Sequence, residues 1–259
     1  MSASAVTSSA PTVGRPLSAS ERLAAAREVV RREAVALWQV SHRLGDELND
    51  ALRLMADCRG AVIVTGMGKA GLIGQKIAAT LASTGATSHF LHPAEAFHGD
   101  LGRVRPGDVV LMLSQSGETA EVLQLLPSLA ESGVPIIAIT ASDQSTAGRA
   151  ARAVLPLGDL DEACSRGLAP STSTTAMLAL GDALALVLSA MRGFTAEDFA
   201  RFHPGGSLGR KLARVDDVMR PLAECRVATI DQTAREVIVG CGKPGRRTGA
   251  VMLTDNAGR

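Results

Sequence analysis

The feature that most constrains the fold is an alternation, between residues 61 and 157, of short apolar runs with helix-like segments. Helical patterns lie between the runs over about 70–84, 118–132 and 145–151. Strands that alternate with helices pair in parallel, and continuously apolar strands suit a sheet covered on both faces. The sequence therefore predicts a three-layer α/β sandwich around a five-stranded parallel sheet, with ligands beyond the carboxyl ends of the strands. The predicted strands are 61–65, 88–92, 109–114, 135–140 and 153–157.

Helices are predicted on both sides of this region. Ser18-Ala-Ser-Glu21 has the form of a capping box, and a long amphipathic helix is expected over about 20–57, with Gly45 as a point where it can break. Its apolar stripe has two open interpretations, packing on its own domain or contact with a second subunit. A further helix is expected over about 172–192. The apolar stripe of the helix expected over 20–57 begins with Leu23, Val30, Leu37 and Leu44.

The two ends of the chain differ in character from the middle. Residues 1–17 are rich in Ser, Ala, Thr and Pro and predict a disordered tail, with a transit peptide as the weaker alternative. Near the other end, a strand-like run over 249–254 is followed by a turn over 255–258 with no returning strand. About 45 residues are too few for an independent core. We therefore expect 213–259 to be an incomplete module of a longer protein, and 18–212 to be the main domain.

Composition excludes several functional classes. The 27 Lys and Arg residues balance 26 Asp and Glu to a formal charge of +1, so no global field favours nucleic acid or an anionic membrane. Aromatic residues make up only 2% of the chain, too few for a base-stacking surface. No run of about 18 apolar residues occurs, which argues against a membrane-spanning helix. The cysteines form no C-x-x-C pair, so a reducing cytoplasm fits best: Cys58, Cys164, Cys225 and Cys241.

The segment Ser114-Gln-Ser-Gly-Glu-Thr-Ala-Glu121 directly follows the third predicted strand. Its hydroxyls, its glycine and the free N–H groups of a helix start can all face one anion, so it predicts a phosphate cradle. Two carboxylates, Glu118 and Glu121, lie in the same turn. Glu121 is the candidate for proton transfer, while Glu118 is expected to support the helix start.

A glycine turn, Gly66-Met-Gly-Lys-Ala-Gly71, follows the first predicted strand and opens a helix. The spacing is that of a dinucleotide fingerprint, but no acidic residue closes the second strand to hold a ribose, so binding of NAD is not favoured. The helix start and Lys69 together place positive charge at the same edge of the sheet.

Two further segments carry chemistry. His92-Pro-Ala-Glu-Ala-Phe-His98-Gly-Asp100 groups histidines with carboxylates, yet six-residue spacing is not a recognised metal signature, and substrate contacts are the preferred interpretation. Glu162 follows the last predicted strand and can face the same crevice. The five hydroxyls of Ser171-Thr-Ser-Thr-Thr175 either cap the next helix, pack against the sheet or contact a ligand. His203 alone would be an ordinary loop histidine.

Taken together, these motifs resemble the sugar isomerase (SIS) domain and, more closely, the arabinose-5-phosphate isomerases of bacteria. The resemblance covers nearly the whole chain, and the segment from Val215 resembles the first half of a CBS module, which comes as a tandem pair in that family. The combination is far more specific than Ser-x-Ser-Gly-x-Thr alone. The segments that carry it are Gly66–Gly71, Ala78–Gly85, His92–Gly102, Ser114–Glu121, Gly167–Thr175 and His203–Gly209.

The resemblance implies isomerisation of D-ribulose 5-phosphate to D-arabinose 5-phosphate through an enediol, at the entry to Kdo and lipopolysaccharide synthesis. It implies no redox cofactor, a homotetramer, and an inhibitory zinc at His92. The implied catalytic positions are Lys69, Glu121, Glu162 and His203, the last entering the site of an adjacent subunit. The implied substrate-binding positions are Gly68, Thr84, Gly85, His92, His98, Ser114, Gln115, Ser116, Thr119, Ser171 and Thr172.

Two rival functions stay open. One is a sugar-phosphate sensor that keeps the cradle and does no chemistry, although the basic part of the first helix is too short for a DNA-binding motif. The other is an SIS isomerase that acts on a different sugar phosphate, since pentose and hexose phosphates share the phosphate and the enediol chemistry.

Overall fold

The computed structural model describes residues 16–164, 166–203, 215–221, 224–240, 250–255 and 257. These residues belong to two compact units, one that ends at His203 and one that begins at Pro204. The predicted boundary between residues 212 and 213, and nearly all of the predicted tail over 1–17, lie outside the described residues.

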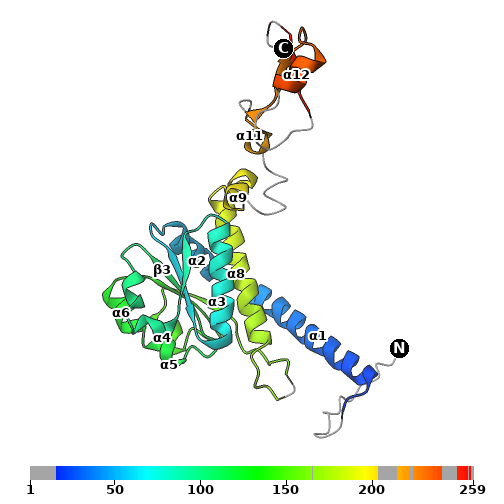
Figure 1. Ribbon diagram of the computed structural model, residues 1–259. Helices are drawn as coiled ribbons and strands as arrows, with labels where there is room; N and C mark the ends of the chain where they lie inside the picture. Colours follow the sequence, from blue (N-terminus) through cyan, green and yellow to red (C-terminus); the bar gives the residue numbers. More distant parts are fainter. Residues whose placement is uncertain are drawn as a thin grey trace. The chain divides into compact units, whose positions relative to one another are not determined.

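A five-stranded parallel sheet forms the centre of the first unit (Figure 1). All four neighbouring strand pairs are parallel, and the spatial order is β2-β1-β3-β4-β5. Each predicted strand matches an observed one to within one residue, so the predicted sheet is confirmed. The strands are β1 (Val62–Gly66), β2 (Ser88–Leu91), β3 (Val109–Leu113), β4 (Ile136–Thr140) and β5 (Ala153–Pro156).

Helices cover both faces of the sheet and make three layers. Alternate residues of β1 show this, because Val62 and Val64 belong to one buried cluster and Ile63 to another. The first cluster packs under α1 (Ala19–Arg43), α2 (Asp46–Ala56), α3 (Gly68–Ser83) and α8 (Thr172–Met191). The second packs under α4 (Pro93–Ala96), α5 (Ala120–Leu123), α6 (Leu126–Glu131) and α7 (Thr146–Ala150). A 3₁₀ helix, η1 (Asp100–Arg103), follows α4.

Two predicted helices are divided. The expected helix over 20–57 breaks at Leu44 and Gly45 into α1 and α2, and the capping box of Ser18 and Glu21 is present. The single helix expected over 118–132 is wrong, because α5 ends at Leu123 and α6 begins at Leu126. Pro127 lies in the first turn of α6, where its missing N–H costs nothing but where it prevents continuation from the preceding turn.

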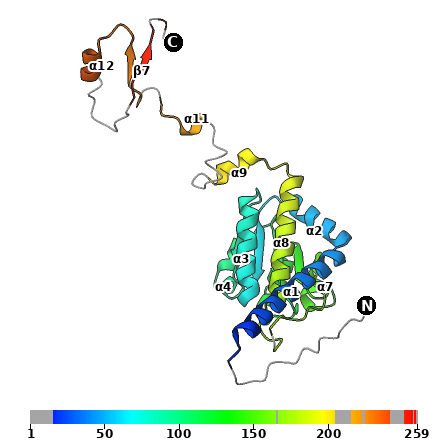
Figure 2. The same ribbon diagram turned by 90° about the vertical axis from the view of Figure 1, so that its right-hand side faces the viewer.

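The apolar stripe of α1 divides between the two interpretations. Toward the end of the helix, Ala36 and Val40 are buried against their own domain. Nearer its start, Leu23 is 52% exposed and Val30 is 68% exposed. Figure 2 shows α1 alongside α8, with its first turns extending beyond that helix. The apolar stripe over the first half of α1 is therefore largely exposed within the described part of the chain.

Among the described residues, α8 alone is long and apolar enough to cross a membrane, with a mean hydropathy of 1.7 over 18 residues. Polar residues interrupt the apolar run of α8, so the helix passes by its mean hydropathy and not as a continuous apolar run. Its packing is that of a core helix, since Met177, Leu180 and Leu184 are buried in the cluster that faces the sheet. Asp182 of α8 also forms an ion pair with Lys76 of α3.

A short helix that the sequence did not predict, α9 (Ala196–Phe202), follows α8 and begins with a capping box of Thr195 and Asp198. In the second unit, α11 (Val215–Val218) precedes β6 (Val227–Thr229), α12 (Ala234–Gly240) and β7 (Met252–Thr254). β7 pairs in parallel with β6, a pairing that the sequence did not predict. The strand finds its partner earlier in the chain, through a crossover that contains α12.

Candidate functional site

The predicted site segments leave the sheet at the carboxyl ends of its strands. Gly66 at the end of β1 pairs in register with Leu113 at the end of β3. The turn that carries Lys69 and the loop that begins at Ser114 therefore start side by side. In the order β2-β1-β3-β4-β5, the crossovers diverge between β1 and β3, which is where doubly wound sheets bind ligands.

The turn between β1 and α3 depends on its glycines. Gly68 has a φ of 57°, which side chains rarely adopt. A Cβ at Gly71 would lie 2.6 Å from the carbonyl oxygen of Gly66, so only glycine lets the helix approach the strand this closely. Lys69 is exposed in the first turn of α3, and its ammonium group has no partner among the described residues. It is therefore free to meet an anion.

The loop after β3 is a preformed turn held by its own hydroxyls. The Ser114 and Thr119 hydroxyl oxygens lie 2.9 Å apart, and the Gly117 N–H donates to Ser114 Oγ at 3.1 Å. The Glu118 N–H donates to Ser116 Oγ at 3.1 Å. Ser114 is only 3% exposed, whereas Ser116 is exposed. Ser114 thus braces the cradle from inside, and Ser116 presents its hydroxyl outward.

Glu118 supports the start of α7 and makes no capping hydrogen bond to α5, the helix that follows it. Its carboxylate accepts a 2.7 Å hydrogen bond from the backbone N–H of Thr146, the first residue of α7. The hydrogen bonds from Thr146 lower the pKa of Glu118. This bond joins the cradle to the loop after β4, and it occupies Glu118 with a structural contact.

Gly117 offers a direct test of the cradle, because its φ is 66° and an added Cβ would overlap the Ser145 hydroxyl. We expect Gly117→Ala to displace the loop, since the left-handed conformation alone costs about 1–2 kcal/mol for an L-residue. Affinity for inorganic phosphate, measured by titration calorimetry, should fall at least about tenfold. Gly133→Ala is the matched control, having the same φ of 66° and nothing within 4 Å of the added Cβ. Equal phosphate affinities for the two variants would contradict the cradle.

The His92–Asp100 segment does not assemble a metal site. His92 is half-buried and precedes α4, while Glu95 and His98 are exposed. In the described part of the chain, no three His, Cys, Asp or Glu side chains are grouped to hold a metal ion. Within these residues, the mixed site that the sequence left open is therefore not assembled from three such ligands.

Unpartnered polar atoms mark the same edge of the sheet. Within the described residues, four buried side-chain atoms have no hydrogen-bond partner: His89 Nε2, His92 Nδ1, Gln115 Oε1 and Thr172 Oγ1. Such atoms are rare in folded proteins and call for an explanation. Three of them belong to predicted substrate-binding residues, each directly following a strand or opening a helix at this edge. His89 lies within β2, and burial lowers its pKa. A polar ligand at the edge would satisfy the other three.

Glu162 lies in the loop between β5 and α8 and is bound to the start of that helix. Its Oε2 accepts the Ser171 N–H at 2.6 Å and the Ser171 hydroxyl at 3.3 Å. Its Oε1 accepts the Ser173 hydroxyl. Partial burial opposes ionisation of this carboxyl, but the hydrogen bonds from Ser173 and Ser171 together outweigh it and lower the pKa of Glu162. The carboxylate is consequently held ionised, as a proton acceptor must be.

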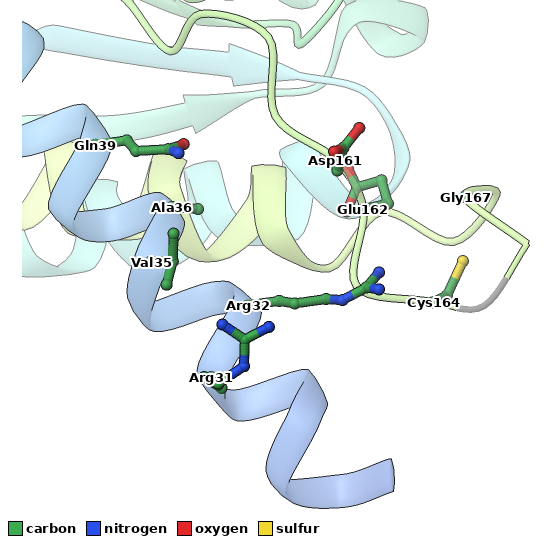
Figure 3. Close-up of a pocket in the computed structure, with 9 residues that line it drawn as sticks. All are labelled: Arg31, Arg32, Val35, Ala36, Gln39, Asp161, Glu162, Cys164 and Gly167. Atoms are coloured by element: carbon green, nitrogen blue, oxygen red, sulfur yellow. The ribbon is translucent and has the colours of Figure 1, made fainter. Parts of the chain in front are cut away.

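A cavity of about 440 Å³ lies between α1 and this loop (Figure 3). Glu162 and Asp161 line it on the loop side, and Arg32 reaches toward the loop from α1. Sequence reasoning did not select Arg31 or Arg32, because only the fold brings α1 opposite a loop more than a hundred residues away. The two arginines place positive charge on the α1 side of this cavity, opposite Glu162, although both also form ion pairs with Glu28.

Three other predicted residues lie at the opposite end of the unit. α8 has 20 residues, so its two ends are about 30 Å apart. Glu162 binds the start of α8. His203 follows α9 and so lies beyond the other end of α8, where its ring stacks on the ring of Phe199 with 3.9 Å between the ring centroids. Thr84 and Gly85 follow α3 at this far end, where a Cβ on Gly85 would overlap Phe194. A single chain does not bring His203, Thr84 or Gly85 to Glu162.

Glu121 lies exposed in the first turn of α5, directly after the cradle, and its side chain has no partner within the described residues. The structure thus joins most predicted site residues at one edge: Gly68, Lys69, His92, Ser114, Gln115, Ser116, Thr119, Glu121, Glu162, Ser171 and Thr172 follow the strands or open the helices there. His98 follows α4 in the same segment. The rest of the motif after His203, residues 204–209, lies outside the described residues.

The fold and the cradle define a protein of the SIS class, and the model of the SIS domain matches residues 54–187. Arabinose 5-phosphate isomerase KpsF of Escherichia coli O6:H1 is 46% identical over 237 residues, which are 90% of this chain and 70% of that protein. Arabinose 5-phosphate isomerase KdsD of Yersinia pestis is 43% identical over 91% of this chain and 71% of its own length. The chain belongs to the family of arabinose 5-phosphate isomerases.

A solved structure agrees with this relationship. The structure of E. coli CFT073 c3406 in complex with A5P superposes with a TM-score of 0.71 at 39% identity, and the match covers 73% of this chain and all of that one. The SIS fold expected from the motifs is thereby confirmed.

Proposed function

We propose that this protein interconverts D-ribulose 5-phosphate and D-arabinose 5-phosphate through an enediol. The observation that carries the proposal is the position of a preformed anion cradle, an unpartnered lysine and an ionised glutamate at the same edge of the sheet, in a chain 46% identical to an arabinose 5-phosphate isomerase. The three unpartnered buried atoms support it, because a hydroxylated ligand can supply their missing hydrogen bonds.

The reaction moves one proton between adjacent carbons and needs no change of oxidation state in a cofactor. A carboxylate removes a proton from C1 of the ketose and returns it to C2, while a proton passes from O1 to O2. Glu162 is held ionised for the carbon-bound proton, with Glu121 as the other candidate base. Lys69 stabilises the negative charge of the enediolate. Ser116 and Thr119, on the turn braced by Ser114, hold the phosphate.

The proposed active site is shared between neighbouring subunits. His203 serves the site of a neighbouring subunit, together with Thr84 and Gly85, since all three lie at the far end of their own chain from Glu162. This fits a homotetramer and the exposed apolar start of α1. We further propose a cytoplasmic enzyme of Kdo and lipopolysaccharide synthesis that needs neither a redox cofactor nor zinc, in which the segment after the SIS domain resembles the first half of a CBS module.

The test is direct observation of the product in deuterated water. D-Ribulose 5-phosphate incubated with the protein should give D-arabinose 5-phosphate in the NMR spectrum, with deuterium entering at C2. A hexulose 6-phosphate and D-ribose 5-phosphate serve as competing substrates. Conversion of another sugar phosphate in preference would identify a different SIS isomerase. Binding without product or exchange would identify a sensor.

A further inference from the structure

The start of α8 is capped in an unusual way. In α1, α7 and α9, the N-cap hydroxyl accepts a hydrogen bond from its own helix. Ser171, the N-cap of α8, makes no such bond. Its place is taken by the carboxylate of Glu162, which comes from the preceding loop and accepts the N–H groups of Ser171 and Ser173, at 2.6 and 3.5 Å. A negative charge is stabilised at the start of a 20-residue helix.

The two oxygens of this carboxylate have different partners. Oε2 receives both backbone N–H groups and the Ser171 hydroxyl. The Ser171 hydroxyl oxygen also accepts the Ala163 N–H at 3.3 Å, so this residue mainly braces the loop. Oε1 receives one hydrogen bond from the described residues, from the hydroxyl of Ser173, which is 1% exposed. The Ser173 hydroxyl therefore holds Oε1 and determines which of its lone pairs remain for a substrate.

Other charged and titratable groups face Glu162 across the cavity of about 440 Å³. Arg31 and Arg32 face it from α1, while Asp161 and Cys164 lie on its own loop. Backbone N–H groups of Ala169 and its neighbours lower the pKa of Cys164, despite the opposing effect of desolvation. Within the described residues, none of these groups donates a hydrogen bond to the carboxylate, whereas Ser173 does so from a buried position.

We propose that Ser173 is a positioning residue for Glu162, which fixes the orientation of the carboxylate and keeps it ionised for proton transfer. The inference rests on the proposed isomerase activity, in which Glu162 takes the carbon-bound proton. Ser173 itself contacts no reacting atom. Its part is to set the proton affinity of the group that does.

Ser173→Ala removes the hydroxyl and adds no atom to a buried position. A hydrogen bond to a charged group, when lost, is expected to raise the pKa of Glu162 by about one unit. Since a carboxyl with a raised pKa protonates sooner as the pH falls, the acid limb of kcat should move up by about one pH unit. At neutral pH, kcat should fall about tenfold through loss of orientation, with KM changed less than about twofold.

Matched variants separate this effect from damage to the helix. Thr174→Val removes a hydroxyl from the same turn, one that donates to the Ser171 carbonyl at 2.9 Å. It should leave the acid limb in place. Ser173→Cys keeps a weak donor of similar size and should restore part of the shift. In a Glu162→Gln background, Ser173→Ala should cause no further loss of rate, because the two residues act through one carboxylate.

A readout without substrate keeps the inference separate from the proposed function. The side-chain carboxyl of Glu162, labelled with ¹³C and assigned by its loss in Glu162→Gln, can be titrated by NMR. Its midpoint should move up by about one pH unit in Ser173→Ala. An unchanged midpoint, or an acid limb that moves equally in Thr174→Val, would overturn the inference. If the Glu162 midpoint shifts in Ser173→Ala but the wild-type protein isomerises no sugar phosphate, the proposed function is refuted. The coupling of Ser173 to Glu162 would then still stand.

Discussion

Replacing Glu162 by glutamine is expected to lower kcat for D-ribulose 5-phosphate by about 10²- to 10⁴-fold, the range for loss of a general base. The fold should survive, because a carboxamide can keep the cap of α8. Its oxygen can take the Oε2 position and accept the Ser171 N–H, while its NH₂ group donates to the Ser173 hydroxyl, which turns to accept. Steady-state kinetics would measure the fall in kcat, and thermal unfolding would show whether the fold survives.

Two carboxylates make matched controls for this result. Asp161→Asn removes a charge from the neighbouring residue of the same cavity and should lower kcat less than about threefold. Glu121→Gln decides between the candidate bases, since the true base should show the larger fall and lose deuterium exchange at the substrate carbon. A Glu162→Gln enzyme with near wild-type exchange would remove Glu162 from the role of base.

Mixing two inactive variants is expected to restore activity. His203→Gln and Glu162→Gln should each fall about 10²-fold or more alone. Because Glu162 binds the start of α8 and His203 lies beyond the other end, with the two helix ends about 30 Å apart, a site built from two chains can combine the intact residue of each. In the simplest pairing of two chains, about one site in four is complete after random exchange.

The experiment requires that subunits exchange, so the variants are co-expressed with different tags and the hybrid is purified on both. As a control, a double variant, Glu162→Gln with His203→Gln, is co-expressed with the wild-type chain, using the same two tags. Its hybrid gives the activity expected when one chain carries both substitutions. Activity of the first hybrid no higher than that of either variant alone would contradict a shared site. The restored rate should rise with the fraction of hybrid measured by native mass spectrometry.

The sheet could be predicted closely because its strands are short, β-branched and continuously apolar. Val109–Leu113, for example, is buried over its whole length, and so its continuously apolar sequence indicates a strand covered on both faces. The division of α5 from α6 could also have been predicted from Pro127. The pairing of β6 with β7 could not, because a three-residue strand gives little pattern and its parallel partner lies across a crossover.

The site was predictable at the level of segments more than of individual contacts. Ser114, Lys69 and Glu162 follow strands, and the carboxyl ends of parallel strands share an edge. The roles of Ser173 and Arg32 depend on how a loop folds back on α8 and how α1 crosses it, and neither is encoded by spacing along the chain. The distance of His203 from Glu162 became visible only through the length and direction of α8.

That same helix makes the chain sensitive to length. One added residue in the middle of α8 would turn everything beyond it by about 100° and advance it by about 1.5 Å. Glu162 would still cap the start of α8 and His203 would still stack on Phe199, yet the two ends of the helix would no longer keep their relative direction. Leu186, 59% exposed, can be exchanged for other residues at little cost. α8 therefore sets the spacing and the relative direction of the residues at its two ends, and in the proposed shared site an insertion or deletion within it would displace His203 relative to Glu162.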